Sequence, residues 1–178
     1  NDQKVTGVLR DGLVLATTLA LPAMYLLWNV APVLLLFGQK PEIVKLAQPY
    51  LHGLAWAIIP DFIITVLLHF VSGLGRTRIN LIFSLLWVPL NIFLNYALMF
   101  GKFGLPNMGI AGIGWGTALA FWIMTISFAV YLWISPAYKN YHLKNVGKIH
   151  WHSFKELLHV GVPIGLMYCV EIGFFLMI

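Results

Sequence analysis

Charged residues are scarce in this sequence, and that scarcity bounds the class of protein. Only 10% of the 178 residues are Asp, Glu, Lys or Arg, whereas 60% are hydrophobic and the mean hydropathy is +0.85. Soluble domains carry about 25% charged residues, so a soluble globular domain is excluded. Several uncharged apolar runs are long enough to cross a bilayer core of about 30 Å. The composition therefore predicts an all-α protein, a polytopic membrane helix bundle.

Cysteine and enzyme motifs are also scarce or missing. The single cysteine, Cys169, lies within an apolar run, so the chain has no disulfide framework. The sequence contains no HExxH, no GxSxG and no phosphate-binding Gly-Lys-Ser/Thr loop, and we do not expect an enzyme. His150 and His152 lack nearby cysteine or carboxylate partners, so we expect no metal site. The net charge of +5 comes from basic residues between apolar runs, so it does not indicate nucleic-acid binding.

Five apolar segments are predicted to be transmembrane helices. The first four lie at about 12–37, 46–74, 79–100 and 108–134, and the fifth lies within 151–178. The chain starts without methionine and stops inside an apolar run, so we expect it to be part of a longer protein.

The distribution of basic residues predicts the orientation in the membrane. Loops alternate sides, and eight of the eleven lysines and arginines fall on the side of the N-terminal end and the 135–151 loop. Cytoplasmic loops carry an excess of Lys and Arg. That side is therefore expected to face the cytoplasm.

A glutamate interrupts the last apolar segment, residues 157–178. An ionised carboxylate in hydrocarbon costs about 2.5–3.5 kcal/mol on insertion scales. Helical spacing places Met167, Tyr168 and Phe175 on roughly the same face as Glu171. That face suits a small cation or a hydrophobic organic cation. The alternative is a protonated glutamate that is hydrogen-bonded to a neighbouring helix.

Three further polar side chains lie inside predicted spans. Asp61 directly follows Pro60, and we expect its carboxylate to be buried near a polar group, either as a coupling group or in a structural hydrogen bond. Asn91 and Asn95 are four residues apart, so they share one helical face. Their amides could bind a neighbouring helix or offer carbonyl oxygens to a cation.

The fourth predicted span begins with several glycines. Gly112 and Gly116 form a small-xxx-small pair, which lets another helix approach closely. Thr117 follows directly. We therefore expect Asn91, Asn95 and Thr117 to converge on one polar pocket between two spans.

Residues 91–124, NIFLNYALMFGKFGLPNMGIAGIGWGTALAFWIM, resemble the multidrug and toxic compound extrusion (MATE) family, especially its NorM-like bacterial branch. The shared features are Asn-x-x-x-Asn-aromatic, then Gly-Lys-Phe-Gly, then a glycine-rich helix start with Gly-Thr-Ala. Downstream, GVPIGLMYCVEIGFF matches the family's Gly-x-Pro with a glutamate eight residues after the proline. The Gly-x-Gly-x-Thr turn at 73–77 also fits. The resemblance covers essentially the whole chain.

The resemblance implies a transporter of two lobes around a central cavity. Residues 1–150 would be the end of the N-terminal lobe with a cytoplasmic linker, and residues 151–178 the first helix of the C-terminal lobe. Family members export bulky, often cationic drugs in exchange for Na⁺ or H⁺. By this resemblance Glu171 belongs to the cation site of the second lobe, and Asn91, Asn95 and Thr117 belong to that of the first. It assigns no role to Asp61.

The predicted function is multidrug efflux by cation-coupled antiport of hydrophobic organic cations, with alternating access between two lobes, in a bacterial inner membrane. The expected partners are organic cations, Na⁺ or H⁺, the lipid bilayer and missing helices of the same protein, and no cofactor is expected. One alternative is a lipid-linked sugar flippase of the wider superfamily, but such flippases have a strongly basic cavity. Another is a non-transporting membrane scaffold or enzyme subunit, and Glu171 counts against the scaffold.

Overall fold

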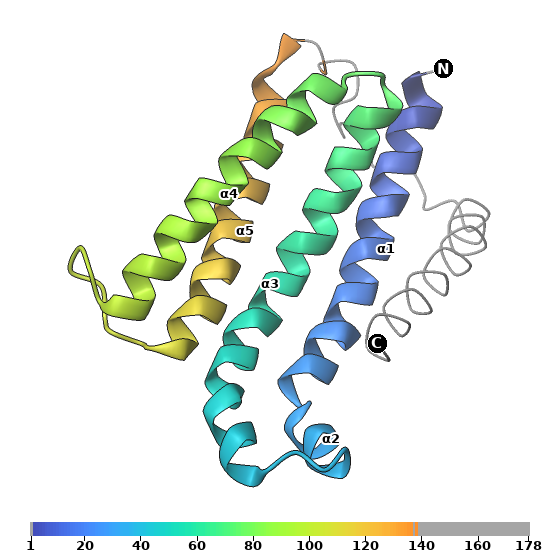
Figure 1. Ribbon diagram of the computed structural model, residues 1–178. Helices are drawn as coiled ribbons and strands as arrows, with labels where there is room; N and C mark the ends of the chain where they lie inside the picture. Colours follow the sequence, from blue (N-terminus) through green and yellow to red (C-terminus); the bar gives the residue numbers. More distant parts are fainter. Residues whose placement is uncertain (1, 137, 139–178) are drawn as a thin grey trace, which may run out of the picture.

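The computed structural model describes residues 2–136 and 138, with side chains from residue 6 onward. All regular structure in this part of the chain is helical (Figure 1). The helices are α1 (Asp2–Trp28), α2 (Ala31–Leu36), α3 (Pro41–Gly73), α4 (Thr77–Phe100) and α5 (Ile110–Ile134). Four of them are long and apolar enough to cross a membrane, all except α2. The prediction of an all-α membrane helix bundle is confirmed, and the fifth predicted span lies outside the described residues.

The central helix of the bundle is α3. It packs against α1 on one side and against α5 on the other, while α4 packs mainly against α5 (Figure 1). A tight turn joins α3 to α4, yet these two helices make few contacts with each other. Both helices pack against α5 and diverge from one another, which leaves room for a cavity between them.

The first predicted span differs from the structure at both ends. It was expected at 12–37, whereas α1 begins at Asp2, ends at Trp28 and is followed by the separate short helix α2. A proline ring clashes with the carbonyl four residues earlier, so Pro32 prevents the helix from continuing smoothly past Trp28. At the start of α2, Pro32 replaces an amide that would have no helical partner. Pro22 lies inside α1 without ending it.

The remaining boundaries follow the predictions more closely. The third helix begins at Pro41 rather than near residue 46, with Glu42 in its first turn, where the helix dipole favours a negative charge. Its 33 residues span about 50 Å at 1.5 Å per residue. The helix α3 is therefore longer than a bilayer core. Hydropathy alone underestimates the length of such a helix, because it detects the apolar part and not the part that extends beyond the hydrocarbon.

Glycines on two faces of α5 let both of its neighbours approach closely. Gly112 and Gly116 face α4, where a Cβ on Gly112 would lie 2.6 Å from the carbonyl carbon of Leu98. Gly114 lies between them in sequence and faces α3, where a Cβ on Gly53 would lie 2.6 Å from a backbone nitrogen of α5. The predicted close approach at the Gly112 and Gly116 pair is confirmed. The spacing explains how one helix serves as the common support for α3 and α4.

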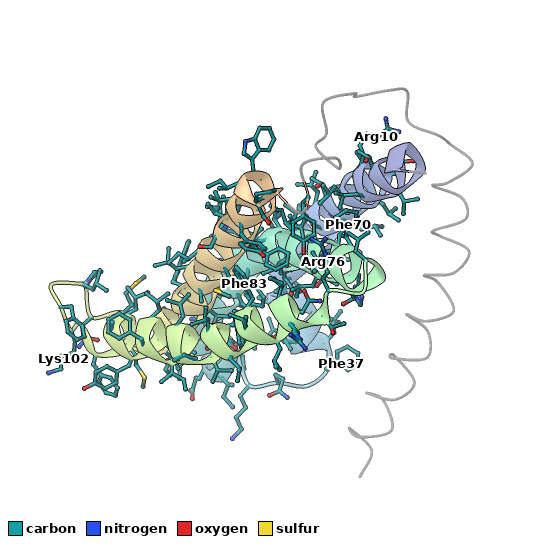
Figure 2. All side chains as sticks on the ribbon, turned by 90° about the horizontal axis from the view of Figure 1, so that it is seen from above. Arg10, Phe37, Phe70, Arg76, Phe83 and Lys102 are labelled. Atoms are coloured by element: carbon teal, nitrogen blue, oxygen red, sulfur yellow. The ribbon has the colours of Figure 1, made fainter. Side chains whose placement is uncertain are left out.

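The basic residues lie near the two ends of the bundle. Arg10 lies in the N-terminal part of α1 and Arg76 directly before α4, whereas Lys102 lies in the loop at the other end of α4 (Figure 2). The guanidinium of Arg76 stacks 4.9 Å from the ring centre of the buried Tyr138. Charges at helix ends leave the intervening apolar surface free to face lipid or further helices.

Candidate functional site

Three polar side chains converge between α4 and α5. The Asn95 amide donates a 3.0 Å hydrogen bond to the Oδ1 atom of Asn91, one helical turn away. Both amides also donate to the hydroxyl of Thr117 at 3.4 Å, and that hydroxyl lies 3.4 Å from Oδ1 of Asn95. All three side chains are partly buried. The expected convergence of these residues is confirmed, and we call them the amide–hydroxyl cluster.

The position of this cluster depends on a glycine. A Cβ on Gly116 would collide with Oδ1 of Asn95 and would lie 3.0 Å from its backbone. The missing side chain allows α4 to lie directly against α5, so that Thr117, the next residue, reaches both asparagines. Close helix approach and polar contact therefore come from the same short segment of α5.

The cluster offers two amide oxygens and one hydroxyl oxygen. Its contacts with Thr117 are longer than the 2.7–3.2 Å of ordinary hydrogen bonds, so little hydrogen-bond energy is lost if the groups rotate. Neutral oxygens of this kind coordinate alkali cations in membrane proteins. They do not complete a coordination shell by themselves, and in residues 6–136 no group of three His, Cys, Asp or Glu side chains comes together. A cation held here would need further ligands.

Asp61 lies halfway along α3 and borders a cavity. The hydroxyl of Thr125 on α5 donates a 3.0 Å hydrogen bond to the carbonyl of Pro60, the residue before it. Asp61 itself is half-buried and does not lie in a loop. We expected a buried carboxylate, and the exposure that remains follows from the divergence of α3 and α4. Two hydroxyls, those of Thr65 and Ser84, border the same cavity.

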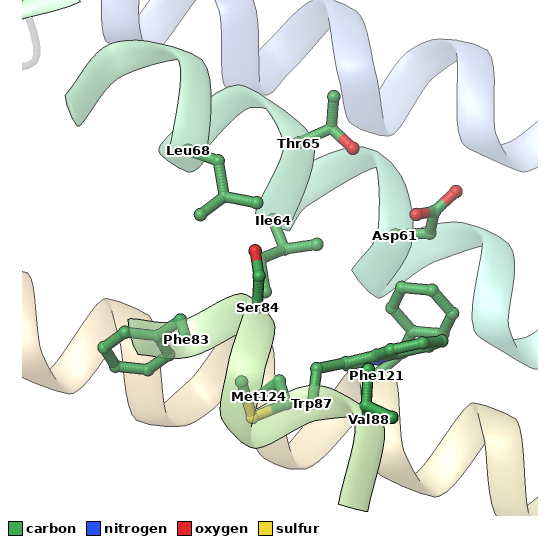
Figure 3. A pocket seen from close by; sticks show the side chains of 10 residues that line it. All are labelled: Asp61, Ile64, Thr65, Leu68, Phe83, Ser84, Trp87, Val88, Phe121 and Met124. Carbon is green, nitrogen blue, oxygen red and sulfur yellow. The ribbon is translucent and has the colours of Figure 1, made fainter. Parts of the chain in front are cut away.

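The cavity has a volume of about 370 Å³ and lies between α3, α4 and α5 (Figure 3). Its lining consists of Asp61, Ile64, Thr65, Leu68, Phe83, Ser84, Trp87, Val88, Phe121 and Met124. It adjoins the amide–hydroxyl cluster, because Trp87 lies one helical turn before Asn91 and Phe121 one turn after Thr117. The two polar features therefore occupy neighbouring levels of the same interhelical space.

One buried acid was not singled out from the sequence. Asp11 is only 1% exposed and pairs with its neighbour Arg10, Nη2 to Oδ1, at 2.7 Å. Asp11 lies just before the first predicted span at 12–37, whereas in the structure it lies within α1, buried against the bundle. The available signal was an adjacent Arg-Asp pair directly before an apolar run, since a buried carboxylate needs a nearby opposite charge.

The other predicted site residues lie outside the described part of the chain. These are Glu171, the proposed second cation site, and Met167, Tyr168 and Phe175, the proposed substrate cavity. Their roles stay predictions.

A polar cluster and a cavity between membrane-crossing helices are typical of membrane transport proteins. The sequence model of the MatE family matches residues 1–97, more than half of the chain. The chain belongs to the MatE family.

Curated relatives extend this similarity along almost the whole chain. A probable multidrug resistance protein NorM from Pseudomonas aeruginosa is 41% identical over 167 residues, which cover 93% of this chain and 34% of that protein. A protein with the same name from Pseudomonas putida is 42% identical over 171 residues, covering 96% and 37% respectively. The chain thus spans little more than a third of the length of these relatives.

A solved structure has the same fold. The crystal structure of the eukaryotic MATE transporter AtDTX14 matches 94% of this chain and 36% of its own, with a TM-score of 0.81 and 20% sequence identity. At that identity the match concerns the fold alone. It agrees with the all-helical bundle described above.

Proposed function

We propose that this chain forms part of a multidrug efflux protein that exports hydrophobic organic cations by cation-coupled antiport. The observation that carries this proposal is the convergence of Asn91, Asn95 and Thr117 between two membrane-crossing helices. Polar groups inside a membrane are costly and mark ion or substrate pathways. The relatives' names describe drug resistance and not catalysis, which supports a transporter rather than an enzyme.

The cluster is suited to couple ion binding to helix position. A cation held by oxygens of both α4 and α5 stabilises the arrangement in which the two helices lie together. A ligand shifts a conformational equilibrium only through its different affinities for the two states. If the oxygens diverge in the other state, Na⁺ binding at this cluster favours one side of the alternating-access cycle. Neutral amides and a hydroxyl do not take up a proton, so coupling to H⁺ would instead use a carboxylate. Glu171 would supply a second cation site in the other lobe.

A lipid-linked sugar flippase remains the alternative within transport. A flippase binds a phosphate-bearing lipid, so it needs basic groups in its cavity. The described lining of the cavity beside Asp61 contains one acidic and no basic residue. This charge favours a cationic substrate over an anionic one.

The proposed location is a bacterial inner membrane, with the N-terminal end and the 135–151 loop in the cytoplasm. Arg76 and Arg78 lie where α4 begins, at the same end of the described bundle as the N-terminal part of α1, which carries Arg10 (Figure 1). The excess of basic residues on cytoplasmic loops supports this orientation.

Transport by the full-length protein in proteoliposomes tests the proposal. An imposed Na⁺ or H⁺ gradient should drive ethidium movement in the opposite direction. Replacing both asparagines, Asn91→Ala with Asn95→Ala, should remove the dependence on the gradient. A matched control is Asn29→Ala, because the Asn29 side chain hydrogen-bonds the carbonyl of Tyr25 in the helix before it and lies outside the amide–hydroxyl cluster. If the rate of ethidium transport by the unmodified protein depends on neither the Na⁺ nor the H⁺ gradient, the proposal is overturned.

A further inference from the structure

The cavity beside Asp61 combines a carboxylate with aromatic rings. We propose that it binds the aromatic organic cation itself, with the Asp61 carboxylate beside the positive charge and with Trp87 and Phe121 against the ring system. This inference deepens the proposed function and rests on it. It assigns Asp61 to the substrate and the amide–hydroxyl cluster to the coupling ion.

The charge of the lining selects the sign of the ligand. Asp61 is the only ionisable residue among the described residues that line the cavity. No hydrogen bond or ion pair to its carboxylate is present among residues 6–136. A carboxylate within a membrane span is stable only with a partner or in a water-filled space. A ligand cation that enters the cavity supplies such a partner.

The aromatic residues select a flat, cationic ligand. The rings of Trp87 and Phe121 lie 5.3 Å apart, centre to centre, at an interplanar angle of 53°. Figure 3 shows them at the same end of the cavity as Asp61, with Phe83 at the opposite end. Indole and phenyl faces attract cations, most strongly where water is excluded. The indole nitrogen of Trp87 is buried and has no hydrogen-bond partner in the described part of the chain, so a small ring rotation toward a ligand acceptor would be favourable.

The size of the cavity favours an organic molecule over a bare ion. Its volume of about 370 Å³ falls within the roughly 300–1,000 Å³ typical of small-molecule sites. A water molecule occupies only about 30 Å³ of liquid volume, so a single inorganic ion would leave most of the space unfilled. Six of the ten lining residues are Ile64, Leu68, Phe83, Val88, Phe121 and Met124. These apolar groups would cover the hydrophobic part of a drug.

The position next to the amide–hydroxyl cluster has a mechanistic consequence. The cavity and the cluster share no residue, so each can be occupied by a different ligand. The cavity and the cluster are only one helical turn apart along α4 and along α5. Two positive charges at so short a distance repel each other in a poorly solvated space. An organic cation at Asp61 therefore weakens binding of the coupling ion, and the reverse. Such mutual weakening is what an exchanger requires.

Equilibrium binding to the full-length protein in lipid nanodiscs tests the charge requirement. The probes are ethidium, which is a flat cation, and phenanthridine, its neutral parent ring system. Asp61→Asn should lower the affinity for ethidium by about tenfold or more, as expected for loss of a close charge partner, and should leave phenanthridine binding unchanged. The matched control is Glu42→Gln, an exposed acid in the first turn of the same helix.

Cysteine protection locates the ligand without disturbing Asp61. Ser84 is exposed within the cavity, and Thr77 lies seven residues earlier on the same face of α4 but outside the lining. In a background with Cys169→Ser and without other reactive thiols, ethidium should slow maleimide labelling of Ser84→Cys at least fivefold. Labelling of Thr77→Cys should be unchanged. This measurement also covers the case in which Asp61→Asn fails to fold.

The outcomes separate this inference from the proposed function. If ethidium is transported but does not change the labelling of Ser84→Cys, the cavity assignment alone is overturned. Equal loss of ethidium and phenanthridine binding in Asp61→Asn, with lower thermal stability, would mean that Asp61 instead pairs with a basic residue of another helix. A full-length protein that neither binds nor moves organic cations would overturn the proposed function as well.

Discussion

The hydroxyl of Thr125 donates a 3.0 Å hydrogen bond to the carbonyl oxygen of Pro60, and both groups are buried. This contact joins α5 to α3 at the residue that precedes Asp61. It ties the backbone next to Asp61 to α5, the helix that also carries Phe121 of the cavity lining. The bond thus links the stability of the bundle to the geometry of the proposed substrate cavity.

Removing this bond should cost measurable stability. Thr125→Val keeps the side-chain shape but removes the hydroxyl, and interhelical hydrogen bonds in membranes contribute about 0.6 kcal/mol on average and up to about 1.7 kcal/mol. We expect a lower midpoint of thermal unfolding in detergent. The matched control is Thr18→Val, because the Thr18 hydroxyl donates to the carbonyl of Val14 in its own helix rather than to another helix. Equal effects of the two substitutions would show that the interhelical bond has no special role.

The hydroxyl of Thr117 should be necessary for ion coupling. Thr117→Val removes the oxygen shared by the two amides, whereas Thr117→Ser retains it. We therefore expect Thr117→Val to lower the affinity for the coupling ion about tenfold or more, as expected for loss of one ligand of a charged group, and Thr117→Ser to have a smaller effect. Transport rates at several Na⁺ concentrations and pH values measure this affinity. Indistinguishable rates for the two variants would contradict the role of the hydroxyl.

Adding one methyl group at Gly116 should disrupt the contact between α4 and α5. A Cβ there would lie 3.0 Å from the Asn95 backbone, and inserting carbon into a tight contact typically costs about 1–3 kcal/mol. Gly116→Ala should lower both the unfolding midpoint and ion-dependent transport. In Gly7→Ala the new Cβ would meet no atom of another part of the described chain within 4 Å, so that variant should be as stable as the unmodified protein or slightly more stable. A stable, active Gly116→Ala protein would show that the helices can separate freely.

The pair of Arg10 and Asp11 should behave as a unit. Arg10→Gln leaves the buried Asp11 carboxylate without its adjacent charge, and removal of one partner of a buried ion pair costs about 3–5 kcal/mol. Adding Asp11→Asn to that variant should recover part of the lost stability, because an amide is less costly to bury than a charge. Thermal unfolding of the single and double variants measures the recovery. No recovery would show that Arg10 stabilises the protein through other contacts.

Glu171 should be required for exchange in the full-length protein. Glu171→Gln keeps the size of the side chain but removes its charge in the middle of the last apolar run. We expect normal membrane insertion, because the variant is more apolar, together with loss of drug/ion exchange in vesicles. Undiminished exchange that still depends on the ion gradient would exclude this role.

The sequence by itself determined the class of protein and most of the helices. Partition into a bilayer depends on local hydrophobicity, so spans at 79–100 and 108–134 correspond closely to α4 (Thr77–Phe100) and α5 (Ile110–Ile134). The shared face of Asn91 and Asn95 likewise follows from the local period of a helix, which needs no knowledge of the neighbours.

Only the tertiary structure decided which surfaces meet. That α3 and α4 diverge, and so form a cavity beside Asp61, follows from the way both helices pack on the glycines of α5. The burial of Asp11 also depends on neighbours distant in sequence, and it could not be read from a polar N-terminal stretch. Hydropathy sums contributions residue by residue, whereas packing depends on the shapes of side chains that come together from separate helices. For that reason the sequence identifies the polar residues inside the membrane, and the fold determines which of them can act together.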